Sequence, residues 1–326
     1  MIDTEEIFAS AGMDHEPPVR SLLTEVITGL SLPQKTLPAK LLYDKKGSEI
    51  FEEICRLPSY YPTQTEMKIL KENAAEMVKL IGEDSLIIEP GSGAAEKVRI
   101  LMAEMKGQIR YVPIEISREI LLRTSRELIE EYDGIQIFPV CGDFTKDLSL
   151  PVSVDQQRGK KVIFFPGSTI GNLDPEEARD FLKNASMLIG KGGGVLIGVD
   201  LKKDPKILRL AYNDPEGVTA AFNLNLLERL NREVDAAFVT RNFRHEARYN
   251  QEKGRIEMNL ESLLPQLVRV NQTVFRFLEG ETIHTENSYK YTVPEFSELG
   301  RRAGITLKKQ WQDADSLFSV YYFEHS

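Results

Sequence analysis

Short apolar runs alternate with amphipathic stretches from Ser85 to Asp200. Apolar runs of this length are typical of strands buried on both faces, and the amphipathic stretches are typical of helices packed on a sheet. The expected strands are residues 85–90, 109–115, 135–140, 161–167 and 192–200, and the expected helices between them include 96–105 and 117–132. Five successive strand–helix units predict a doubly wound parallel sheet, which binds ligands outside the carboxyl ends of its strands.

The helix after the fourth strand has a well-marked start. Asp174 is the expected N-cap, Pro175 stands at the first helical position, and Glu176 and Glu177 place acids in the first turn. Each of these residues is favoured at that place in a helix.

The pattern changes after about Lys202. A helical segment, 223–233, is followed by alternating apolar and polar residues over 236–250, 254–264 and 268–292, which is typical of antiparallel strands. The chain then returns to a helix, 293–304, and two closing strands, 305–312 and 316–325. We interpret this as an α/β domain with an inserted α+β unit. The expected α/β domain is 61–201 with 288–326, and the expected auxiliary domain is 1–60 with 202–287.

The composition describes an ordinary globular chain of 326 residues, with 41% hydrophobic and 28% charged residues. The net charge of -9 provides no basic field for a phosphate backbone, so we expect no nucleic-acid partner. Cys55 and Cys141 are far apart, and the four histidines are scattered, so we expect no metal site. No apolar run approaches the length of a membrane span, and the first ten residues are acidic where a secretory signal is basic. We therefore expect a cytoplasmic protein, monomeric and without a membrane partner.

A glycine-rich turn, Glu89-Pro-Gly-Ser-Gly, stands at the end of the first expected strand. Gly91 and Gly93 allow a ligand to approach the backbone closely, although a plain strand-to-helix turn would use the same residues. A dinucleotide fingerprint requires a third glycine at position 96, where this chain has a glutamate. A carboxylate at that helix start opposes a diphosphate, which disfavours a nucleotide-dependent oxidoreductase.

Acidic residues also follow the second and third expected strands. Glu115 ends the second strand, and Asp143 and Phe144 follow the third. Each acid taken alone is equally a helix cap or a solvated charge. Together they offer carboxylates and an apolar slot, which is what a nucleoside without phosphates requires. They resemble the arrangement of class I methyltransferases, in which the acid after the second strand holds the ribose of S-adenosylmethionine and the acidic and apolar residues after the third hold its adenine.

Several long segments resemble the histidine Nα-methyltransferases of ergothioneine biosynthesis, which trimethylate histidine to hercynine. They are LYDKKGSEIFEEICRLPSYYPTQTE (42–66), EPGSGAAEK (89–97), FFPGSTIGNLDP (164–175), AYNDPEGVTAAFNLNLLERLNRE (211–233), RIEMNL (255–260) and TENSYKY (285–291). The similarity extends from about Leu41 to the C-terminus. It implies a Rossmann-like class I methyltransferase domain that carries an auxiliary substrate-binding domain, with S-adenosylmethionine as cofactor and L-histidine as substrate.

The resemblance also implies roles for individual residues. Gly91, Lys97, Glu115, Asp143 and Phe144 match cofactor positions, although the family more usually has Asp where this chain has Glu115. Asn172 and Tyr60 match residues that hold the α-carboxylate, Gly167 matches a backbone position beside the α-amine, and Glu286 and Ser288 match the pair that hydrogen-bonds the imidazole. Tyr43, Phe51, Tyr212, Thr219 and Met258 match further residues that line the pocket. Tyr43 or Tyr60 could relay protons through water, but no residue is identified as a base.

A carboxylate that accepts the ring N–H and a hydroxyl that donates to the other nitrogen would read both ends of a neutral imidazole. Without the resemblance, Glu286 and Ser288 would be assigned to an exposed strand face, Tyr60 to the core or its rim, and Asn172 to a helix entry. Two other functions remain open at this stage. One is methylation of another amino acid or small biogenic amine, and the other is binding without catalysis.

Overall fold

A computed structural model describes residues 13–14, 19–145, 150–151, 154 and 159–325, and these form two compact units. The larger unit comprises residues 62–202 and 291–326 together with residues 13–14. The smaller unit comprises residues 19–61 and 203–290.

The expected domain boundaries differ from these units by one to three residues at 61/62, 201/202 and 287/290. The N-terminal segment differs more. Residues 1–12 and 15–18 of the expected auxiliary domain lie outside the described residues, and β1 (Met13–Asp14) pairs in parallel with β6 (Val140–Cys141) of the larger unit. The assignment of residues 1–60 entirely to the auxiliary domain is therefore wrong for β1.

The larger unit is built on a sheet that has nine strands within the described residues, in the order β1-β6-β4-β3-β7-β8-β15-β14, with β5 paired to β4. The remaining strands are β3 (Leu86–Pro90), β4 (Arg110–Glu115), β5 (Gln136–Ile137), β7 (Lys161–Phe165), β8 (Gly194–Asp200), β14 (Ile305–Gln312) and β15 (Phe318–His325). Neighbouring strands from β6 to β8 are parallel, whereas β15 is antiparallel to β8 and β14 is antiparallel to β15. The strand order reverses between β3 and β7, which is where a doubly wound sheet places its ligand. The predicted α/β fold is confirmed.

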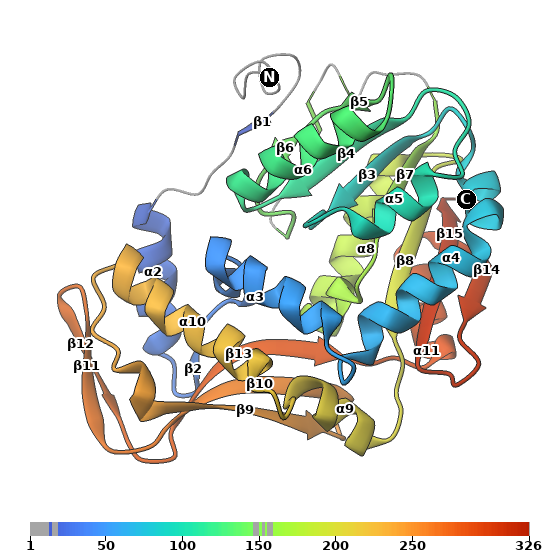
Figure 1. Ribbon diagram of the computed structural model, residues 1–326. Helices are drawn as coiled ribbons and strands as arrows, with labels where there is room; N and C mark the ends of the chain where they lie inside the picture. The colour runs from blue at the N-terminus through green and yellow to red at the C-terminus, as the bar shows by residue number, and fades with distance from the viewer. Residues whose placement is uncertain (1–12, 15–18, 146–149, 152–153, 155–158, 326) are drawn as a thin grey trace. The chain divides into compact units, whose positions relative to one another are not determined.

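Helices accompany this sheet (Figure 1). They are α4 (Tyr61–Ile81), α5 (Glu96–Met102), α6 (Arg118–Glu131), α8 (Pro175–Ile189) and α11 (Val293–Arg302), with a short 3₁₀ helix η2 (Thr169–Asn172). Helix α6 packs on β4 and β6, and α8 packs on β7 and β8. The predicted start of α8 is confirmed, because Asp174 is its N-cap and the Asp174 N–H donates to Glu177 Oε2 at 2.8 Å.

Two local expectations were wrong. The expected strand 135–140 is two short strands, β5 and β6, interrupted at Phe138 and Pro139. Proline has no N–H to donate to a neighbouring strand, so it does not continue the ladder. The expected helix 96–105 ends at Met102, five residues before Gly107, which has a positive φ of 95°.

The smaller unit has a four-stranded sheet in the order β2-β13-β10-β9 and a hairpin of β11 and β12. Its strands are β2 (Lys35–Thr36), β9 (Phe243–Asn250), β10 (Arg255–Ser262), β11 (Gln266–Val270), β12 (Thr273–Phe277) and β13 (Thr282–Tyr289). Its helices are α2 (Val19–Leu30), η1 (Ala39–Leu42), α3 (Lys45–Arg56), α9 (Pro205–Tyr212), α10 (Val218–Glu233) and η3 (Thr240–Asn242). The predicted antiparallel pairing is confirmed for β9, β10 and β13.

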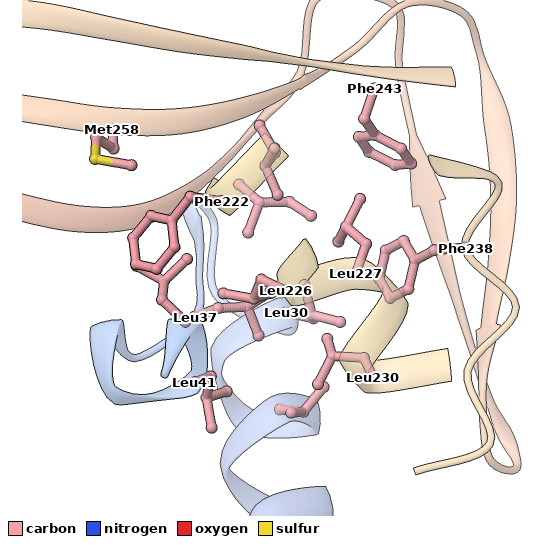
Figure 2. Packing of buried hydrophobic residues seen from close by; sticks show 14 of the residues in the cluster. Leu30, Leu37, Leu41, Phe222, Leu226, Leu227, Leu230, Phe238, Phe243 and Met258 are labelled. Carbon is pink, nitrogen blue, oxygen red and sulfur yellow. The ribbon is translucent and has the colours of Figure 1, made fainter. Parts of the chain in front are cut away.

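The core of the smaller unit forms around α10. Phe222, Leu226 and Leu230 recur every four residues and therefore lie on one face of that helix. Figure 2 shows this face among residues from distant parts of the chain, including Leu30 of α2 and Met258 of β10. The sheet and helices of the smaller unit, which carry Tyr212, Met258, Glu286 and Ser288, are thus held by one continuous hydrophobic cluster.

Candidate active site

The glycine-rich turn begins where β3 ends. Gly91 and Gly93 have φ values of 69° and 49°, in the left-handed region that favours glycine. The Gly91 N–H donates to the carbonyl of Ile114 at 2.7 Å, so the turn is tied to β4. A Cβ at Gly91 would lie 3.4 Å from the ring of Phe144, which brings together two of the residues expected to bind the cofactor.

Glu115 is buried at the end of β4 and faces this turn. Its Oε2 accepts the Gly93 N–H at 3.1 Å, and its Oε1 accepts the Ser117 N–H at 3.0 Å. Burial raises the pKa of the Glu115 carboxyl, and these backbone hydrogen bonds oppose the rise. Each carboxylate oxygen has a further lone pair, so the side chain keeps acceptor capacity for a hydroxyl of a bound ligand.

Asp143 and Phe144 follow β6, as the sequence predicts. Asp143 is half-buried, and its Oδ1 accepts the Thr145 N–H at 3.1 Å. The ring of Phe144 meets those of Phe165 and Phe181 edge to face, with centroids 5.5 and 6.1 Å apart. An aromatic wall and a carboxylate therefore stand beside the glycine turn.

Lys97 and Gly167 are joined by a residue that the sequence analysis did not single out. Glu66 of α4 is buried, and its Oε2 accepts both Lys97 Nζ at 2.6 Å and the Gly167 N–H at 2.8 Å. Gly167 has a φ of 81°, and a Cβ there would lie 3.3 Å from Lys97 Nζ. One carboxylate thus fixes the turn after β7 relative to the first turn of α5.

Asn172 is the last residue of η2 and is half-buried, close to that turn in sequence. In the smaller unit, Thr219 is buried in the first turn of α10, where its N–H donates to Asp214 Oδ1 at 2.8 Å.

An aromatic cluster occupies the smaller unit. Tyr43 meets Phe51 and Phe222 edge to face at centroid distances of 5.5 and 5.4 Å, and Tyr60 meets Tyr212 at 5.9 Å. Burial, and next the proximity of Tyr212, raise the pKa of Tyr60 well above its ordinary value. Tyr60 therefore stays a neutral phenol near neutral pH, a form that can donate a hydrogen bond.

Glu286 and Ser288 lie on the same face of β13, because side chains two residues apart on a strand project to one side. Both are buried, which rules out the exposed strand face that the sequence alone suggests. Met258 of β10 is also buried and is the cross-strand partner of Glu286. Burial raises the pKa of the Glu286 carboxyl to about 7, and the positive charge of Lys290 opposes that rise.

Tyr212 is held at both its hydroxyl and its backbone. Its OH lies 2.8 Å from Ser288 Oγ, and its carbonyl lies 2.8 Å from Nε2 of His245. The amide Nδ2 of Asn223 lies 3.0 Å from Nδ1 of His245, so Nδ1 accepts and Nε2 donates in the neutral tautomer. Burial lowers the pKa of His245, which favours this neutral form.

Two residues missed by the sequence analysis left detectable signals. Glu66 occupies a position within the apolar stripe of α4, between the buried residues Pro62 and Ile69. Lys290 continues the alternation of Glu286 and Ser288 by one further step. A charged residue at a position that periodicity assigns to the interior indicates a buried ionic contact.

Within the described part of the chain, no three or more His, Cys, Asp and Glu side chains are grouped to hold a metal ion. No helix among the described residues combines the length and hydropathy of a membrane span.

A doubly wound sheet with a glycine turn after the first strand of the α/β unit and carboxylates after the next two defines a class I, Rossmann-like methyltransferase. The same fold is found in an S-adenosylmethionine-dependent methyltransferase from Clostridium acetobutylicum, with a TM-score of 0.50, 11% sequence identity, and coverage of 86% of this chain and 97% of that one. The model of the family described as histidine-specific methyltransferase, SAM-dependent, matches residues 22–325. The chain belongs to this family of S-adenosylmethionine-dependent enzymes.

Individual relatives agree with this family. The chain is 40% identical to a histidine N-alpha-methyltransferase of Mycolicibacterium smegmatis, over 86% of this chain and 89% of that protein. It is 39% identical to the histidine N-alpha-methyltransferase of Mycobacterium tuberculosis, over 92% of this chain and 94% of that protein. It is 32% identical to ergothioneine biosynthesis protein 1 of Neurospora crassa, over 89% of this chain and 34% of that longer protein.

Proposed function

We propose that this enzyme transfers methyl groups from S-adenosylmethionine to the α-amino nitrogen of L-histidine, up to the trimethylated product hercynine, as a step toward ergothioneine. The observation that carries the proposal is the buried pair of Glu286 and Ser288 on one face of β13. A carboxylate accepts an N–H and a hydroxyl can donate to a lone pair, and a neutral imidazole has one N–H and one acceptor nitrogen.

The residues around the glycine turn fit the cofactor. Gly91 and Gly93 leave the backbone uncovered, Glu115 offers carboxylate oxygens for the ribose, and Asp143 and Phe144 offer an acceptor and a ring face for adenine. Glu96 begins α5 where a diphosphate would need an uncharged helix start, which suits a nucleoside without phosphates. S-adenosylmethionine, when bound, supplies an electrophilic methyl group on its sulfonium.

The remaining residues have to hold the amino acid by its backbone atoms. In this proposal Asn172 and Tyr60 donate to the α-carboxylate, and Gly167 lies beside the α-amine. Tyr60 suits that role because its high pKa keeps the O–H proton in place. Methyl transfer requires a neutral amine lone pair in line with the methyl carbon, so alignment supplies most of the catalysis.

Successive methylation turns the α-nitrogen into a fixed cation. The clustered faces of Tyr43, Phe51, Tyr60 and Tyr212 favour a cation by about 0.5 to 2 kcal/mol. This cluster supports continuation to the third methyl group. We also propose that the protein is monomeric and cytoplasmic. Size-exclusion chromatography with light scattering tests the oligomeric state.

The direct test is mass spectrometry of L-histidine incubated with S-adenosylmethionine and the protein. We expect mass increments of one, two and three methyl groups, with the final product identical to hercynine by fragmentation. A methyl group on the imidazole ring would overturn the proposed orientation. Activity with another amino acid or a biogenic amine, and none with histidine, would overturn the substrate.

A further inference from the structure

Lys290 is a buried lysine next to the residues proposed to recognise the imidazole. Its side chain is only 2% exposed, although lysine is among the residues least often buried. It follows Glu286 and Ser288 at two-residue spacing, immediately after the end of β13. An ammonium taken out of water needs strong partners, so its contacts indicate what it does.

Two of those contacts are hydroxyl groups. Lys290 Nζ donates to Ser288 Oγ at 2.8 Å and to Tyr212 OH at 2.9 Å, and these two oxygens lie 2.8 Å from each other. The ammonium also lies 4.8 Å from the centroid of the Tyr212 ring. The three polar groups therefore form a closed triangle inside the smaller unit.

The number of protons in this triangle limits what it can offer a ligand. An ammonium has donors only, so both hydroxyl oxygens accept from Lys290. One hydroxyl then donates to the other, and the receiving oxygen has both of its lone pairs occupied. That receiving hydroxyl has one function left, which is to donate its own hydrogen outside the triangle. The donating hydroxyl keeps one lone pair, so the triangle offers a ligand one hydrogen and one lone pair, and the ammonium beside that lone pair disfavours a cationic ligand.

We infer that Lys290 is a positioning residue that turns the hydrogens of the Ser288–Tyr212 hydroxyl pair away from its ammonium, so that the pair donates to the lone pair of one ring nitrogen while Glu286 accepts the N–H of the other. The inference rests on the proposed function and extends it, because it selects the neutral imidazole. An imidazolium has an N–H at both nitrogens, so its second N–H would face the hydroxyl that donates, and no hydrogen bond would form between them. Without Lys290, each hydroxyl regains the lone pair that the ammonium occupied, and the preference of the pair for donating is lost.

The charge of Lys290 supports the other half of this arrangement. Its ammonium favours the ionised form of Glu286 against the effect of burial. An ionised carboxylate only accepts hydrogen bonds, whereas a protonated one also donates. Lys290 therefore helps to keep Glu286 a hydrogen-bond acceptor and the Ser288–Tyr212 hydroxyl pair a donor.

The inference is tested by a double-mutant cycle on the KM for histidine, with Lys290→Met and Ser288→Ala alone and together. We expect Lys290→Met to raise KM about tenfold or more, as for a hydrogen bond that involves a charged group, with kcat changed less than about threefold. Because both residues act through the same donor, the double variant should have a KM within about twofold of the weaker-binding single variant. If the increases in KM of the two single variants multiply in the double variant, Lys290 has only a structural role and the inference is overturned.

Two controls accompany the cycle. Lys35→Met removes another poorly exposed ammonium of the smaller unit, one that pairs with Glu281 and lies over Phe277, and it should leave KM within about twofold of the wild-type value. Lys290→Gln keeps donors without the charge, so it should recover part of the lost affinity. An effect of Lys35→Met on KM as large as that of Lys290→Met would also overturn the inference.

A measurement on the wild-type enzyme covers the case in which Lys290 variants do not fold. The two pyrrolylalanines each keep one ring N–H and have C–H in place of the other nitrogen. As competitive inhibitors, both should bind at least about tenfold more weakly than histidine. If either analogue binds as tightly as histidine, this inference is overturned but the proposed function is not. Failure of the wild-type enzyme to methylate histidine would overturn the proposed function, and the inference with it.

Discussion

Two buried carboxyl groups titrate far from their ordinary range, one in each unit. Burial raises the pKa of Glu89 to about 8, opposed by the Tyr111 hydroxyl, which donates to it at 2.5 Å, and by Lys97. Burial likewise raises the pKa of Glu286 to about 7. In both residues the protonated form is favoured more in the folded chain than in the unfolded one.

For Glu89 this difference makes stability depend on pH. From about pH 4.5 to 8 the unfolded chain loses a proton that the folded chain keeps, so the free energy of unfolding falls by up to about 1.4 kcal/mol per pH unit. Glu89→Gln removes this titration, so its stability relative to the wild type should increase steadily from pH 5 to 8. Urea unfolding at four pH values in that window measures the difference.

The matched control is Glu298→Gln. Glu298 lies at the surface, and hydrogen bonds from Arg301 and then Arg302 lower its pKa to about 2, so above about pH 6 it is ionised in both states. Its stability difference from the wild type should not change with pH in that range. A constant difference for Glu89→Gln as well would contradict the prediction.

Glu286 provides a test of recognition by hydrogen bonding as opposed to shape. In Glu286→Ala the ring N–H of histidine is buried without its partner, at a cost of roughly 1 to 3 kcal/mol, whereas phenylalanine has no such group. The ratio of kcat/KM for histidine to that for phenylalanine should fall by about tenfold or more. Adding Met258→Val should further favour bulky rings, since Met258 is the cross-strand partner of Glu286. An unchanged ratio would mean that Glu286 does not contact the ring.

At the scale of elements, α4 and β8 approach each other closely through Glu66. A Cβ at Gly198 of β8 would lie 1.8 Å from Glu66 Oε1. Gly198 therefore leaves the space in which the carboxylate holds both the Gly167 N–H and Lys97. Because Gly198 has no side chain, the Glu66 carboxylate fits beside β8 and can hold the turn after β7.

Gly198→Ala should consequently displace Glu66 and destabilise the protein by about 1 to 3 kcal/mol. In a Glu66→Ala background the same change should cost much less, because the crowded group is gone. Urea unfolding of the two single variants and the double variant measures the coupling. An equal cost of Gly198→Ala in both backgrounds would show that the strand tolerates the methyl group independently of Glu66.

At the scale of the whole molecule, the residues proposed to bind the cofactor and those proposed to read the imidazole belong to different compact units. Gly91, Glu115 and Asp143 belong to the larger unit, and Glu286 and Ser288 belong to the smaller one. Each unit has its own hydrophobic cluster. Substitution of a cofactor residue should therefore act on cofactor binding, and substitution of Glu286 or Ser288 should act on histidine binding.

This separation is measurable by calorimetry with S-adenosylhomocysteine. Asp143→Ala should weaken its binding by about 1 to 3 kcal/mol, because the acceptor for the adenine amino group is lost. Glu286→Ala should leave the dissociation constant within about twofold of the wild-type value. A comparable loss in both variants would contradict the separation, and no loss in Asp143→Ala would place the adenine elsewhere.

The sequence by itself determined the features that arise from short stretches of chain. The apolar runs that became β3, β4, β7 and β8, the start of α8 at Asp174, and the glycines that adopt positive φ follow from periodicity, capping and backbone sterics. The resemblance of long motifs then supplied the family and the list of site residues. These features could be predicted because each depends on residues that are neighbours in sequence.

The tertiary structure alone decided which polar residues are buried and which groups they meet. Glu66 reaches Gly167 across 101 residues of sequence, and Lys290 reaches Tyr212 across 78. Burial of Glu286 and Ser288, the interruption between β5 and β6, and the pairing of β1 with β6 likewise depend on packing between distant segments. A local pattern records the character of a residue but not the dielectric environment or partners that folding gives it, and these set its pKa and its role in recognition.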